Sequence, residues 1–214
     1  MIIKKNLFLV LVLSQLSYAQ SYHQYASEFF FGLEASSKAE AMGKGSVAAI
    51  TDATAQHYNP ALLNNLEGLN ITYSYSTPYY VLVDAQYNYA GITYRLNGKH
   101  SIGMSYHNFN SGNKSEFLNN TFQIDDWSYM SLTTSYSYEL SNNFSIGTNL
   151  NYFNVHGNRT SSNVSDNNFH AMLIDVGIIK KFDFFASKRS SHSFYFGGSL
   201  KNILQTKLEI NSSE

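Results

Sequence analysis

From Leu69 onward, apolar and polar residues alternate along the chain with a period of two. In residues 69–76, for example, Leu, Ile and Tyr occupy one parity, whereas Asn, Thr and Ser occupy the other. Strict alternation of this kind is typical of β-strands that have one apolar and one polar face. The segments that follow the pattern are 69–76, 86–96, 100–109, 127–140, 144–153, 169–182 and 193–201. The sequence therefore predicts an all-β fold with seven strands in this region.

The chemistry of the two faces argues against a soluble, secreted β-sandwich. A soluble sandwich buries Val, Ile and Leu between its sheets and exposes charged residues. Here the polar parity carries Ser, Gly, Asn and Thr, and charged residues make up only 14% of the chain. The apolar parity carries aliphatic residues, with aromatics near the strand ends: Tyr73, Tyr75, Tyr87, Tyr89, Tyr136 and Tyr138. Small polar residues inside and apolar residues outside predict a transmembrane antiparallel β-barrel.

The connections between the predicted strands alternate in length. Residues 96–99 and 140–143 are short joints, whereas residues 110–126 and 157–168 are long ones. Outer-membrane barrels combine tight periplasmic turns with long external loops in this way. The third joint on the short side, residues 183–192, is longer than this pattern leads us to expect.

The first residues have the features of a secretory signal peptide. Lys4 and Lys5 precede an apolar stretch at 7–16, and residues 17–19 form a small-x-small cleavage site. We expect a signal peptide over residues 1–19 and a location in the bacterial outer membrane, with membrane lipid as a partner. The chain has no Cys, so no disulfide is expected. The net charge of −1 gives no electrostatic case for binding nucleic acid.

Residues 20–66 lack the alternation and contain signals for short helices. Ser37 and Glu40 have the spacing of a capping box, which predicts a short helix. Gly43 and Gly45 follow and are expected to end it.

Two further helix starts follow within the same region. Asp52 is placed to cap a helix over residues 53–58. Asn59 and Pro60 form an N-cap and N1 pair for another turn, which continues into Ala61. A series of short capped helices with small side chains packs well in a confined space, so we expect a plug inside the barrel lumen. The residues of this plug motif are Gly43, Gly45, Asp52, Asn59, Pro60 and Ala61.

Residues 36–65, SSKAEAMGKGSVAAITDATAQHYNPALLNN, resemble the N-terminal hatch of the FadL-type outer-membrane channel family, and especially its PorV/PorQ branch. The matching positions are Met42, Gly43, Gly45, Ala48, Asp52, Ala53, Ala55, Asn59, Pro60, Ala61 and Leu63. Residues 197–204 resemble the end of a strand in the same family. The resemblance implies a fourteen-stranded barrel that passes hydrophobic molecules or serves in type IX protein secretion.

Seven strands are half of the number that this resemblance implies. Residues 203–210 also alternate and would supply an eighth strand. We reject a complete eight-stranded barrel because its own side chains would fill its interior and leave no room for the plug. We therefore expect three parts, a signal peptide (1–19), a plug (20–66) and the strands of an incomplete barrel (67–214), which together form the N-terminal half of a longer protein.

The candidate reactive groups have ordinary structural explanations. Lys44 does not fit a phosphate loop, because that motif requires Gly-x4-Gly-Lys-Ser/Thr. His107, Asp125 and Asp126 fall in or beside one long connection, where solvated polar residues are expected. The seven His show no metal-ligand spacing, and no nucleophile accompanies a base. We expect no catalytic residue, no metal and no cofactor, and therefore no enzyme.

Asp175 is the one acidic residue in the middle of a predicted strand, on the parity of Leu173 and Gly177. If this parity faces the lumen, Asp175 would contact the plug or line a path. Ordinary polarity of the lumen is the simpler interpretation.

Two functions follow from these expectations. As a component of type IX secretion, the chain would dock secreted proteins or their processing machinery through its long loops, and would co-purify with secretion subunits. As a plug-gated pore, it would instead pass hydrophobic molecules such as long-chain fatty acids, and would contain an apolar pocket between plug and wall.

Overall fold

The structure of the chain, a computed structural model, describes residues 32–43, 46–78, 84–112, 114–117, 120–123, 126–158, 167–187, 190–204 and 206. Seven strands form one sheet in the order β1-β2-β3-β6-β7-β8-β9. Their bounds are Leu69–Ser76 (β1), Gln86–Arg95 (β2), His100–Asn110 (β3), Asp126–Ser141 (β6), Phe144–Asn158 (β7), Asn167–Ser187 (β8) and Ser190–Leu200 (β9). Each corresponds to one predicted strand, which confirms the all-β fold class.

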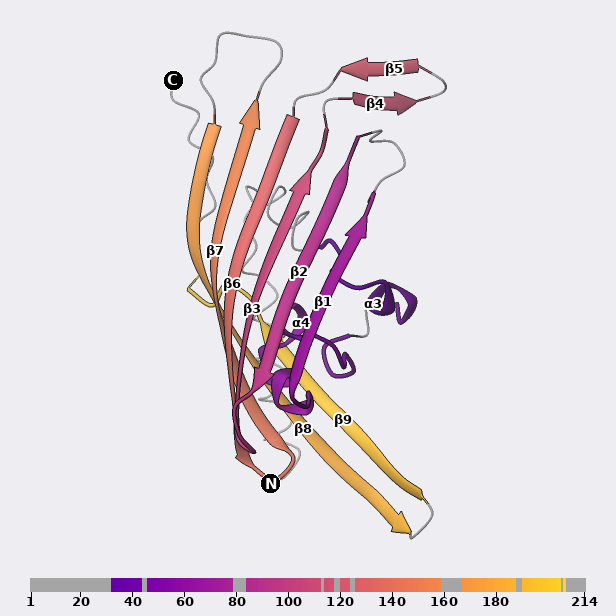
Figure 1. Cartoon of the computed structure of the whole chain (residues 1–214), viewed down its shortest axis with the longest axis vertical. Helices are drawn as coiled ribbons and strands as arrows, with labels where there is room; N and C mark the ends of the chain where they lie inside the picture. Colours follow the sequence, from indigo (N-terminus) through magenta and orange to yellow (C-terminus); the bar gives the residue numbers. More distant parts are fainter. Residues whose placement is uncertain are drawn as a thin grey trace, which may run out of the picture.

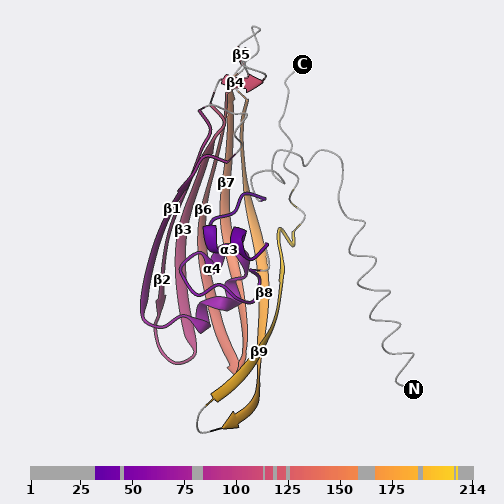
Figure 2. The same cartoon turned by 90° about the vertical axis from the view of Figure 1, so that its right-hand side faces the viewer.

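Neighbouring strands of the sheet are antiparallel throughout. The register shifts between Glu139 and Ser141 and between Phe184 and Ser187, in both cases near a turn. The sheet curves into a half-barrel, as Figures 1 and 2 show. In the part of the chain that the structure describes, no helix has the length and apolar character needed to cross a membrane.

The two faces of the sheet differ as the alternation predicts. On β7, the side chain of Leu150 is 45% exposed on the convex face, whereas Asn149 and Asn151 on the concave face are 1% and 5% exposed. On β3, Met104 is 50% exposed and Ser105 is 2% exposed. A soluble protein rarely exposes so many large apolar residues on one continuous surface.

The prediction that Tyr87 and Tyr89 face outward is wrong. They are 1% and 0% exposed and lie on the concave face. The alternation of β2 determines this, since Ile92 and Tyr94 take the outward parity farther along the strand. The concave face therefore has an aromatic part as well as a polar part, and its other large buried members are Phe109, Tyr129 and Phe153.

Two connections also differ from the prediction. The long connection 110–126 contains a hairpin of β4 (Lys114–Phe117) and β5 (Asn120–Gln123), which lies beyond the ends of β3 and β6 (Figure 1). Strands of four residues are too short to give a clear periodicity. The joint predicted at 183–192 is largely strand, because β8 and β9 extend into it as a paired ribbon.

Residues 32–66, called here the N-terminal segment, lie along the concave face of the sheet (Figure 2). They contain α3 (Ser37–Ala41), α4 (Ala55–Tyr58) and the 3₁₀ helix η2 (Pro60–Asn65). Leu33 and Ala35 pack with the aromatic side chains of the concave face. The other cluster of the segment receives Ile179 from the sheet, and its remaining buried members are Ala39, Ile50, Ala55, Ala61, Leu62 and Leu66. The predicted signal peptide, residues 1–19, lies outside the described residues.

Candidate functional site: the contact between the N-terminal segment and the sheet

Local hydrogen bonds set the turn that leads into α4. Asp52 Oδ1 accepts from the backbone N–H of Thr54 at 2.8 Å and from Thr54 Oγ1 at 2.5 Å. This Asx-type turn occupies the first residues of the predicted helix, so α4 begins at Ala55 rather than at Ala53. Thr54, not Asp52, is the N-cap residue. Asp52 therefore shapes the approach to the helix.

Asn59 joins the helices of the N-terminal segment to one another and to the sheet. Its Oδ1 accepts from the N–H of Ala61 at 3.0 Å and caps η2, whose first residue is Pro60. Its Nδ2 donates to the carbonyl oxygens of Val47 and Ile178, both at 2.9 Å. Asn59 is 0% exposed, so its amide makes these contacts shielded from water.

Glycines on the concave face let the backbone of the segment lie directly on the strands. A Cβ at Gly147 would come closer than 3.0 Å to backbone atoms of Pro60 and Ala61. A Cβ at Gly177 would come equally close to the amide of Asn59. Gly147 and Gly177 are partners in the register of β7 and β8. Together they form a floor without side chains beneath the turn that begins η2.

Gln56 fills a second close contact, with β2, β3 and β6. Its Nε2 donates to the carbonyl of Met104 at 3.1 Å and to Tyr89 OH at 3.3 Å. Its Oε1 accepts from Ser135 Oγ at 3.0 Å. A Cβ at Gly103 would lie 2.5 Å from this Oε1, so glycine makes room for the amide.

Asn64 makes the contact nearest the tight turns. Its side-chain amide lies 2.7 Å from Ser101 Oγ and 3.0 Å from Ser137 Oγ. Its backbone carbonyl accepts from Arg95 Nη1 at 2.5 Å. Arg95 in turn forms an ion pair of 3.3 Å with Glu139. This part of the interface is therefore also built from hydrogen bonds.

Asp175 lies on the concave face, 4% exposed, and all of its partners belong to the sheet or the residues just after it. Its Oδ2 accepts from Asn151 Nδ2 at 2.9 Å and Asn149 Nδ2 at 3.3 Å, and lies 3.5 Å from Lys201 Nζ. Its Oδ1 accepts from the N–H of Asn202 at 2.9 Å. A buried carboxylate is tolerated when it is paired and hydrogen-bonded in this way.

Two partners of Asp175 also reach the N-terminal segment. Asn149 Nδ2 donates to the carbonyl of Gln56 at 2.9 Å, and Lys201 Nζ donates to the carbonyl of His57. Asp175 therefore orients groups that hold α4, although it does not touch the segment itself.

His107 is a buried residue of β3, so its predicted place among solvated loop residues is wrong. It is 4% exposed, and its Nδ1 lies 3.2 Å from Tyr87 OH. Its ring centroid is 4.8 Å from that of His57 in α4. Asp126 begins β6, and Asp125 lies outside the described residues. Because successive residues of β3 point to opposite faces, His107 lies on the same inward face as Ser105.

The remaining residues of the predicted motif have separate places. Gly43 has a φ of +60° in the turn after α3, a conformation that favours glycine, and no atom would contact a Cβ there. Gly45 lies outside the described residues. Ala61 is buried, and its carbonyl accepts from Ser137 Oγ at 3.3 Å. Gly43 therefore reverses the chain, whereas Ala61 belongs to the contact.

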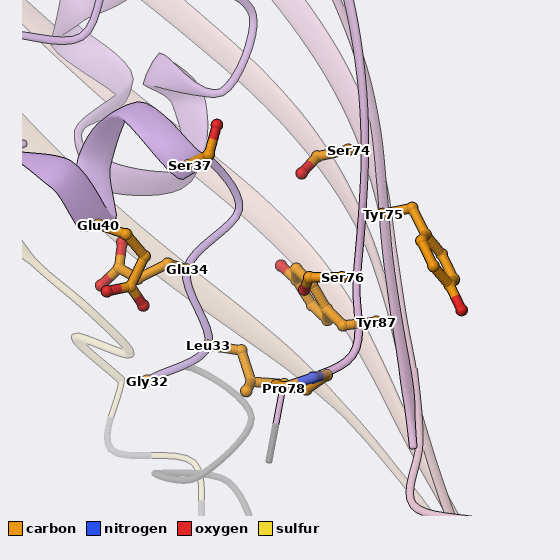
Figure 3. Close-up of a pocket in the computed structure, with 10 residues that line it drawn as sticks. All are labelled: Gly32, Leu33, Glu34, Ser37, Glu40, Ser74, Tyr75, Ser76, Pro78 and Tyr87. Atoms are coloured by element: carbon orange, nitrogen blue, oxygen red, sulfur yellow. The ribbon is translucent and has the colours of Figure 1, made fainter. Parts of the chain in front are cut away.

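A cavity of about 590 Å³ lies between the N-terminal segment and the upper part of β1 and β2 (Figure 3). Figure 3 shows Glu34 and Glu40 on one side and Ser74, Ser76 and Tyr87 on the other. The volume is within the range of ligand pockets, and the lining combines carboxylates and hydroxyls with apolar groups such as Leu33 and Pro78.

The sequence contains a signal for part of this site that the predictions from the alternation do not include. Gly103, Gly147 and Gly177 all take the inward parity of their strands, and glycine repeated on one face marks close approach of another backbone. Gln56 and Asn64 give no comparable signal, because their partners come from distant strands. Within the described ranges, no group of three or more His, Asp or Glu side chains is placed to hold a metal ion.

Comparison with known proteins identifies the family. A family model described as type IX secretion system protein PorV matches residues 21–202. No curated protein matches the chain. The matched range contains the whole N-terminal segment and all seven strands of the half-barrel, and it confirms the resemblance of residues 36–65 to the PorV/PorQ branch of FadL-type channels. The chain therefore belongs to the PorV family of type IX secretion system proteins.

Proposed function

We propose that the chain is an outer-membrane component of type IX secretion whose long connections dock secreted proteins or their processing machinery. In this role the half-barrel is part of a membrane-spanning wall, and the N-terminal segment is its plug. The observation that carries the proposal is the distribution of side chains on the sheet. Large apolar residues are exposed on the convex face, and small polar residues are buried beneath the segment on the concave face. Lipid is the partner that fits such a convex face.

The connections opposite the tight turns supply the docking surface. The β4–β5 hairpin lies at the upper end of the sheet in Figure 1, whereas the turns at residues 96–99 and 142–143 lie at the lower end. Long external loops and tight periplasmic turns are the usual arrangement in outer-membrane barrels. The hairpin and the ends of β7 and β8 at Asn158 and Asn167 would then face the exterior, where secreted proteins emerge.

The cavity beside α3 favours this role over passive transport of hydrophobic molecules. Transport predicts an apolar pocket between plug and wall. The cavity instead has a mixed lining, in which the side chains of Glu34 and Glu40 lie among apolar groups such as Leu33. The carboxylate of a long-chain fatty acid would meet like charges there, and this interaction is unfavourable at every distance in the cavity.

The test is replacement of residues 112–125, which include the β4–β5 hairpin, by a tight turn in the full chain expressed in its own cells. We expect secreted proteins to accumulate inside the cells and secretion subunits to be lost from affinity pull-downs. Assembly would stay normal, measured as heat-modifiable migration of the outer-membrane fraction. The matched control is an altered turn at residues 97–99, which should leave secretion unchanged. Normal secretion in the hairpin variant, combined with lost fatty-acid uptake, would refute docking in favour of transport.

A further inference from the structure

Two histidines meet where the N-terminal segment contacts the sheet. His57 lies in the last turn of α4, and His107 lies in the second half of β3. Their ring centroids are 4.8 Å apart with an interplanar angle of 45°. The ring of His107 also lies 4.8 Å from that of Tyr89 and makes its Nδ1 contact with Tyr87 OH. His107 is therefore enclosed largely by aromatic side chains, whereas His57 is only partly buried.

The charged group nearest this pair is already positive. Lys201 Nζ donates to the carbonyl of His57 and lies 3.5 Å from Asp175 Oδ2. The Asp175 carboxylate is shared with three other donors. The titratable groups that face the pair from the surrounding elements are Glu34, Tyr58, Tyr87, Tyr89, Asp175 and Lys201. The Asp175 carboxylate, which pairs with this ammonium, thus has little capacity left for a second or third cation.

We propose that the His57–His107 contact is an acid-sensitive latch, in which protonation of the two rings releases the N-terminal segment from the sheet. The inference rests on the proposed role of this segment as a plug. Two imidazolium ions beside the Lys201 ammonium would repel one another at contact distance, and the buried ring of His107, which is 4% exposed, would have little water to screen its charge. Neutral imidazoles do not repel one another in this way. The N-terminal segment therefore stays on the sheet only when both rings are uncharged.

The direction of the pH effect follows from His57. Loss of hydration lowers its pKa well below the ordinary value of 6.5, and His107 and Lys201 lower it further. In the released segment His57 meets water and regains the ordinary pKa. A group whose pKa is lower in the seated state stabilises that state above its released pKa, and the stabilisation is lost as the pH falls below about 6.5. Acid therefore favours release.

The size of the effect follows from the same linkage. Between pH 7.5 and pH 5.5, one histidine that stays neutral when seated raises the released fraction about tenfold. Two such histidines raise it about a hundredfold. The window lies above the range in which exposed carboxylates titrate, so these contribute little to the change.

Thiol labelling of the full chain in detergent or vesicles measures this release. The chain has no Cys, so Ala53→Cys introduces a single thiol at a position that is 0% exposed against the sheet. Its labelling rate is divided by that of Asn142→Cys, in an exposed tight turn, to remove the intrinsic pH dependence of the thiol. We expect this ratio to rise between tenfold and a hundredfold from pH 7.5 to pH 5.5.

Two variants test whether the His57–His107 contact causes the rise in the labelling ratio. In the Ala53→Cys background, His57→Gln with His107→Gln should make the ratio flat between pH 7.5 and pH 5.5. The matched control is His100→Gln, whose ring contacts Tyr136 OH at an exposed site and whose loss should leave the rise intact. A flat ratio in the parent protein, or a rise that persists in the double variant, would overturn the latch. The labelling ratio of the Ala53→Cys protein, measured between pH 7.5 and pH 5.5, tests the latch even if the double variant does not assemble. Loss of secretion on deleting the β4–β5 hairpin tests the proposed function separately.

Discussion

Replacing Gly147 by Ala should loosen the N-terminal segment, because the new methyl group has no space. A Cβ at this position would approach backbone atoms of Pro60 and Ala61 more closely than 3.0 Å. Backbone cannot rotate away as a long side chain would, so the turn that begins η2 must lift from β7. Lifting this turn also pulls Asn59 away from its 2.9 Å contacts with Val47 and Ile178.

The magnitude has two parts. Overpacking by one methyl group costs about 1–3 kcal/mol. Weakening the two hydrogen bonds of Asn59 adds about 0.5–1.5 kcal/mol for each bond. Allowing for partial relaxation, we expect seating of the segment to weaken by about 2–4 kcal/mol, which raises the released fraction about 30- to 1000-fold.

The matched control is Gly198→Ala on β9, where a Cβ would lie 3.9 Å from Ile178 Cγ1 in ordinary contact. This change removes a flexible glycine from a strand and should be neutral or slightly stabilising. Both variants are compared by the labelling ratio of Ala53→Cys at pH 7.5. Equal ratios in the Gly147 and Gly198 variants would show that the glycine floor does not seat the segment, and the reasoning would be wrong.

Two further predictions concern the hydrogen bonds of Asn59 and the outer face of the sheet. Asn59→Ala removes a helix cap and two hydrogen bonds to carbonyls, so the same labelling assay should show a loss of about 2–4 kcal/mol. Asn65→Ala, at an exposed position of η2, should change the ratio little. Leu150→Arg places a charge on the exposed convex face and should cost about 2–4 kcal/mol of unfolding free energy in vesicles if that face touches lipid. Asn142→Arg in the tight turn should cost almost nothing, and equal stabilities of these two Arg variants would rule out a lipid-facing sheet.

The strands could be predicted from the sequence because two different solvents select two different sets of side chains. The polar parity of β3 and β7 is small because the N-terminal segment packs on it, and the other parity is apolar because it is exposed on the convex face. Residues 69–76 were predicted with the bounds that β1 has in the structure. The alternation depends on nearest neighbours in the chain, so one sequence is enough to read it.

The contacts across the interface could not be predicted in the same way. Tyr87 and Tyr89 suit either face, because a phenol ring packs against lipid or protein and its hydroxyl finds an acceptor in both. Only the folded chain shows that Tyr89 OH donates to the carbonyl of Ala53 at 2.7 Å. Gln56 is similar, since its partners on β2, β3 and β6 become neighbours only when the sheet curves around the segment.

The small core inside the N-terminal segment has a consequence for how the segment would leave its seat. Its apolar residues cover one another, and Ile179 is the residue that the sheet contributes to this core. Beneath Asn59 and Gln56, departure uncovers the ring of Tyr89 together with serine hydroxyls, amides and bare glycine backbone, and water can solvate these polar groups at once. In this region an emptied channel would wet rather than collapse, and the segment could return to a surface that had kept its shape.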